Sequence, residues 1–99
     1  MQIEYEMGYT PSEFKKTLQG QFTTRTEYSY KEFSPDHWLI LLDKESMSVD
    51  IKINESTPRK IAMLTLPVLN VYFEFDNTSE SQQVDFLKTF FKYFHKGGG

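Results

Sequence analysis

Hydrophobic and polar residues alternate along several stretches of this chain with the two-residue period of a β-strand. In such a stretch every second side chain points to the same face, so one face is expected to be buried and the other solvated. One stretch, around Trp38, is apolar at both parities and is also predicted to be a strand. The strands predicted in this way are residues 2–7, 22–30, 37–43 and 47–54.

The segment from Thr10 to Glu13 has the features of a helix start. Thr10 can cap the helix, Pro11 suits its first position, and Glu13 completes a capping box. Phe14 and Leu18 then lie one turn apart on the same face. Because glycine commonly ends helices, a short helix of about two turns that stops at Gly20 is predicted.

A second helix is predicted after residue 79. Ser79 and Gln82 have the spacing of another capping box. Apolar side chains then recur at helical spacing, which is typical of a helix with one buried face. Gly97 is expected to end this helix. The apolar stripe consists of Val84, Leu87, Phe91 and Phe94, widened by Phe86 and Phe90.

Residues 61–75 are long for one strand and contain Pro67, which cannot donate to a sheet ladder. The apolar parity changes next to the proline, which favours one long bent strand with a bulge there. Under this interpretation Leu66 and Leu69 both contact the core. A hairpin is the alternative, but the segment lacks the glycine or Asn-Gly pair typical of a tight turn.

These elements predict a single α+β domain over residues 1–96, with residues 97–99 as a flexible glycine tail. The order β-α-β-β-β-β-α indicates an antiparallel sheet of about five strands with both helices on one face. This order is similar to that of the TATA-binding protein fold, and a likeness in element order alone implies no function. The helix-facing residues are expected to be Ile3, Tyr5, Trp38, Ile40, Met47, Val49, Ile51, Val71 and Phe73.

Composition and charge restrict the function classes. The net charge is −3 with scattered basic residues, which argues against nucleic-acid binding because such domains carry a basic surplus. The chain has no cysteine, so it has neither disulfides nor thiolate zinc sites. Without a signal-peptide pattern or an apolar run of membrane-spanning length, a soluble cytoplasmic protein that does not enter membranes is expected.

No catalytic, metal or cofactor site is predicted. His37 and His95 do not have metal-ligand spacing. Ser34 and Asp36 flank the turn beside His37, but the nucleophile elbow that would make them catalytic is missing. The tail resembles the diglycine end of ubiquitin-like modifiers, in which it follows a strand. Here it follows a predicted helix, so a helix cap with a frayed end is favoured.

The strand around Trp38 predicts the interaction surface. Leu39 and Leu41 should lie on the face away from the helices, which is otherwise polar, and Tyr72 is expected to join them. An apolar patch on a polar face is typical of a partner surface. The leading hypothesis is therefore a non-enzymatic interaction or accessory module that binds a protein partner or itself. A small apolar-ligand carrier of helix-grip type is the alternative, based on the aromatic stripe, and an enzyme whose site the sequence does not reveal is a third.

Overall fold

The computed structural model of the chain describes residues 2–23, 27–42 and 47–94. Within these ranges the elements are β1 (Gln2–Met7), α1 (Pro11–Thr23), β2 (Tyr28–Ser34), β3 (His37–Leu42), β4 (Met47–Glu55), β5 (Arg59–Ile61), β6 (Leu64–Leu66), β7 (Leu69–Asp76) and α2 (Glu80–Tyr93). The glycine tail and His95 lie outside the described residues.

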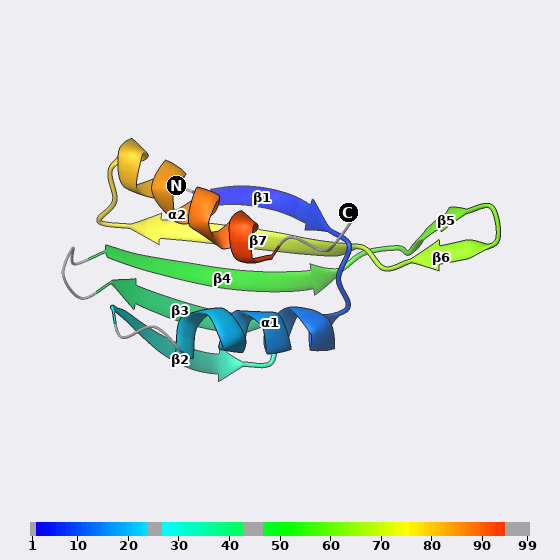
Figure 1. Cartoon of the computed structure of the whole chain (residues 1–99), viewed down its shortest axis with the longest axis horizontal. Coiled ribbons are helices and arrows are strands. Elements are labelled where there is room, and N and C mark those ends of the chain that lie inside the picture. Colours follow the sequence, from blue (N-terminus) through cyan, green and yellow to red (C-terminus); the bar gives the residue numbers. More distant parts are fainter. Residues whose placement is uncertain (1, 24–26, 43–46, 95–99) are drawn as a thin grey trace.

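The described elements form an antiparallel five-stranded sheet with the order β1-β7-β4-β3-β2. Strand β1 forms one edge, and α1 leads across the sheet to β2 at the other edge (Figure 1). Strands β2, β3 and β4 then follow as neighbours, and β7 returns between β4 and β1. Both helices cover the same face of the sheet (Figure 1). The predicted α+β class and its five-stranded antiparallel sheet are confirmed.

The core lies between this face and the two helices, and it is rich in aromatic rings. Phe90 of α2 lies at the centre, with its ring centroid 4.9 Å from Phe73 of the sheet and 6.3 Å from Phe14 of α1. Trp38 is fully buried against Phe14. The predicted helix-facing residues of β3, β4 and β7 are all buried, so the sheet face was assigned correctly. Val84, which was predicted to belong to the buried stripe of α2, is exposed instead.

The capping box at the start of α1 is confirmed. The Glu13 backbone N–H donates to Thr10 Oγ1 at 3.1 Å, and the Thr10 N–H donates to Glu13 Oε1 at 3.0 Å. Thr10→Ala removes the first of these bonds and leaves a helix N–H without its acceptor. We expect it to lower the free energy of unfolding by about 1 kcal/mol, measured by urea unfolding. Thr10→Ser, which keeps the hydroxyl, should unfold close to the wild type; equal losses in both variants would contradict the capping role.

Helix α1 is longer than predicted because Gly20 does not end it. Phe14, Leu18, Gln21 and Phe22 are all buried, and they repeat at helical spacing on one face. One glycine inside a helix costs about 1 kcal/mol, which the burial of Phe22 outweighs at about 1.5–3 kcal/mol. The second predicted strand, residues 22–30, was therefore placed too early.

The prediction of one bent strand over residues 61–75 is wrong. Strands β5 and β6 pair as a separate antiparallel hairpin, which extends beyond the end of the main sheet (Figure 1). Ala62 lies in the turn with φ of 54°, a left-handed conformation that usually requires glycine. Pro67 lies between β6 and β7, where no ladder bond is needed from it. Leu69 is fully buried, whereas Leu66 is exposed.

Candidate interaction surface

The sheet face away from the helices is the outer face, and it holds the two predicted leucines. Their neighbours Trp38 and Ile40 are fully buried on the opposite side of β3, so Leu39 and Leu41 point outward. Leu39 is half-buried and Leu41 is exposed. The outer face therefore presents two apolar side chains two residues apart along one strand.

Neighbouring strands give these leucines a polar border. Leu39 is paired with Lys31 on β2 and with Asp50 on β4. Leu41 is paired with Ser29 and Ser48 on the same two strands. The apolar area is thus a narrow strip along β3, flanked by charges of both signs.

Tyr72 does not join this strip. It lies on β7, where it pairs with Lys52 of β4, so a complete strand separates it from β3. Two strand spacings amount to about 10 Å. The structure places all three predicted residues on the outer face but brings only the two leucines together.

Phe33 is an apolar residue of this region that sequence reasoning missed. The register of β2 and β3 shifts between Glu32 and Ser34, and the exposed Phe33 ring lies 5.0 Å from the His37 ring. Lys31 Nζ lies 5.4 Å from the centre of the same ring. Phe33 has the same parity as Ser29 and Lys31, so a strand predicted as far as Ser34 would have revealed it. We call Phe33, Leu39 and Leu41 the outer strip.

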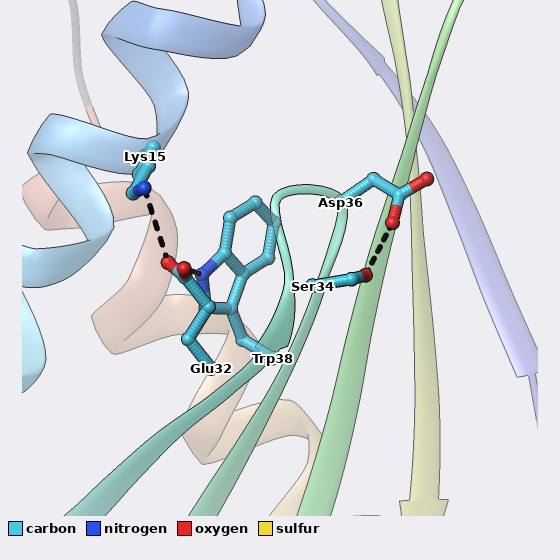
Figure 2. A network of polar contacts seen from close by, with 5 residues as sticks. All are labelled: Lys15, Glu32, Ser34, Asp36 and Trp38. Carbon is cyan, nitrogen blue, oxygen red and sulfur yellow. Dashed lines mark hydrogen bonds and ion pairs between the residues drawn. The ribbon is translucent and has the colours of Figure 1, made fainter.

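His37 is held by neighbours that do not form a catalytic relay. Its Nε2 lies 2.8 Å from Asp50 Oδ1, whereas Ser34 Oγ donates to Asp36 Oδ1 at 2.5 Å (Figure 2). Ser34 is thus hydrogen-bonded to one carboxylate and His37 to another, and these bonds do not form the Ser–His–Asp sequence of a catalytic triad. Within the described residues, no group of three histidine or acidic side chains could hold a metal ion.

An open hollow of about 490 Å³ adjoins His37 at this end of the sheet. Its other lining residues are Gln2, Ser34, Asp36, Lys52, Ile53, Asn54 and Tyr72. Tyr72 therefore borders a mixed polar hollow rather than the leucines. The lining has charges of both signs and is open to solvent, which does not match the mostly apolar, enclosed sites typical of small-molecule binding.

The aromatic stripe that suggested an apolar-ligand carrier is packed against other rings. Phe86 stacks on Phe22 with centroids 5.9 Å apart, and Phe90 stacks on Phe94 at 4.1 Å. Phe90 also contacts the sheet at Phe73. The rings that would line a helix-grip cavity are instead in contact with one another.

Comparison with known proteins gives no relative from which a function could be transferred: no family model, curated protein or solved structure matches the chain. In the part of the chain that the structure describes, no helix is long and apolar enough to cross a membrane.

Proposed function

We propose that this protein is a non-enzymatic interaction module that binds a protein partner through the outer strip. The observation that supports it most is the position of Leu39 and Leu41 on a sheet face whose neighbouring positions are polar or charged. Isolated exposed leucines are ordinary on protein surfaces, whereas Leu39 and Leu41 are same-face neighbours on one strand, and the exposed Phe33 ring lies on the same side, next to His37 and Lys31.

The border of the outer strip suits a protein surface. Interfaces commonly have an apolar centre and a polar rim that provides specificity. Here the centre is Leu39 and Leu41, and the rim contains Lys31 on one side and Asp50 on the other. These charges would favour a partner with an acidic group opposite Lys31 and a basic group opposite Asp50. Phe33 adds an aromatic side chain at one end, a residue type enriched in interface centres.

Replacing Leu39 and Leu41 with serine tests this proposal. Burying both leucines would contribute roughly 3 kcal/mol at about 25 cal/mol per Å², so we expect the double variant to bind its partner about 100-fold more weakly. The measurement is quantitative capture of proteins from the source cells by immobilised wild type and variant, followed by titration of the protein that the variant loses. The fold should persist, as judged by circular dichroism and thermal melting.

Val84→Ser provides the matched control. Val84 is an exposed apolar residue on α2, so this variant makes a similar chemical change away from the outer face. It should capture the same proteins as the wild type. If the Leu39→Ser, Leu41→Ser variant also captured every protein with unchanged affinity, the outer strip would not be the binding surface.

A further inference from the structure

The β5–β6 hairpin has two unlike faces. Its register pairs Arg59 with Leu66, Lys60 with Thr65 and Ile61 with Leu64. Directly opposed residues of an antiparallel pair share a face, and residues two apart along a strand share it as well. One face therefore carries three apolar side chains and Arg59, while the other carries Lys60 and Thr65. We call the first the apolar face of the hairpin.

This apolar face is uncovered in the single chain. The exposed fractions of its side chains and of the turn residue Met63 are 52% for Ile61, 97% for Met63, 64% for Leu64 and 41% for Leu66. A two-stranded hairpin has little stability in water unless a face is covered by other structure. Since the hairpin extends beyond the sheet (Figure 1), a second molecule can reach its apolar face.

A small apolar hollow lies at the base of the same hairpin. Its volume is about 130 Å³, and it is lined by Glu6, Met7, Gly8, Arg59, Leu66, Pro67 and Val68. A Cβ added at Gly8 would meet no atom within 4 Å, so there is space beside this residue. Leu66 belongs both to the hollow and to the apolar face of the hairpin, which makes the two surfaces continuous.

The charges at the base favour a protein over an anionic membrane. Arg59 Nη2 lies 3.5 Å from Glu6 Oε2, so the cation that shares the apolar face already has an acidic neighbour. The hairpin has only one further cation, Lys60, which is fewer than the roughly four to eight basic residues typical of segments that bind anionic lipid.

We propose that the hairpin binds a second copy of this chain in a two-fold symmetric dimer. The two hairpins lie antiparallel with their apolar faces together, and Met63 of each copy enters the basal hollow of the other. In a two-fold symmetric dimer the same surface of each copy faces the other, so the contact between Met63 and the hollow forms twice. The length of the hairpin is compatible with this arrangement. Strand β6 has three residues, which span about 10 Å, and the same length separates the turn from the base in both copies.

The size of this interface predicts a weak dimer. Stable dimers bury about 800 Å² on each partner, and a hairpin with three-residue strands offers less than that. We therefore expect the dimer to dissociate on dilution, and light scattering at increasing concentration should show a rising mean mass. This interface is separate from the outer strip, so the Leu39→Ser, Leu41→Ser variant should dimerise normally and either proposal can fail without the other.

Disulfide crosslinking tests the geometry directly, because the natural chain has no cysteine. Two variants are prepared separately, Met63→Cys and Val68→Cys. In an antiparallel dimer the turn of one copy lies at the base of the other, so an oxidised mixture should crosslink between position 63 and position 68. Each variant alone should crosslink slowly, because its two cysteines lie at opposite ends of the interface. Equal crosslinking of the Met63→Cys variant alone would overturn the antiparallel arrangement.

A second test changes the two sides of the proposed contact separately, and its first variant leaves the turn unchanged. Gly8→Leu occupies the space that Met63 would enter, and Met63→Ser removes the side chain that fills it. Each should raise the dimer dissociation constant by about tenfold to a hundredfold in sedimentation velocity, while Val84→Ser should not change it. A wild type that stays monomeric at millimolar concentration would overturn the proposal, as would a wild type that binds vesicles of anionic lipid through Met63 and does not self-associate.

Discussion

Replacing Phe90 with alanine is expected to lower the free energy of unfolding by about 3–5 kcal/mol. Phe90 is fully buried, and its ring contacts Phe14 of α1, Phe73 of the sheet and Phe94. It therefore connects both helices to β7, and its ring lies closer to Phe73 than those of Phe86 and Phe91 of the same helix, which are each 6.4 Å away. Since a domain of this size is stable by about 5–15 kcal/mol, the loss is a large fraction of the total.

Urea unfolding followed by circular dichroism measures this loss. Val84→Ala is the matched control, because Val84 lies on the same helix and is exposed; its change should stay within about 0.5 kcal/mol. Phe90→Leu should fall between the two, since it keeps part of the buried volume. A loss below about 1 kcal/mol for Phe90→Ala would mean that the core collapses around the missing ring and that Phe90 is not central to it.

The features that the sequence predicted correctly depend on local chemistry. The alternation around Val49 and Ile51 identifies the buried face of β4 because each strand residue points opposite to its neighbours. Both capping boxes, at Thr10 and Ser79, involve residues three positions apart. Such patterns depend on neighbouring residues alone, so they can be read before the fold is known.

The errors arise where distant contacts decide between local alternatives. Glycine commonly ends a helix, so Gly20 was predicted to do so, but burial of Phe22 in the core keeps the chain helical to Thr23. Ala62 is a poor residue for a tight turn, yet it adopts a φ of 54°. The register of β7 between β1 and β4 fixes where the main sheet starts again at Leu69, and this leaves residues 59–66 to form a hairpin of their own.

The candidate surface was predictable only along single strands. The outward direction of Leu39 and Leu41 follows from the parity of β3, and the structure agrees. Tyr72 has the correct parity but lies two strands away, because the sheet order places β4 between β7 and β3. Which residues are neighbours across strands depends on sheet order and register, and a single sequence does not reveal either.

The contact between Glu32 and Trp38 leads to the second large effect. Trp38 is fully buried, and its Nε1–H donates to Glu32 Oε1 at 3.1 Å (Figure 2). Lys15 Nζ lies 3.3 Å from the same oxygen. The Glu32–Lys15 pair is partly exposed, so its ion-pair energy should be small. The hydrogen bond to the indole matters more, because a buried donor that loses its acceptor carries its full desolvation cost.

Three substitutions separate these contributions. Glu32→Leu removes the acceptor and should lower the free energy of unfolding by about 1–3 kcal/mol. Glu32→Gln keeps a carbonyl oxygen for the indole and loses only the charge, so it should cost clearly less, as should Lys15→Met at below about 1 kcal/mol. Trp38 is the single tryptophan of the chain, so its fluorescence during urea unfolding reports on this environment directly. If Glu32→Gln were as destabilising as Glu32→Leu, the charge pair rather than the indole hydrogen bond would be the stabilising interaction.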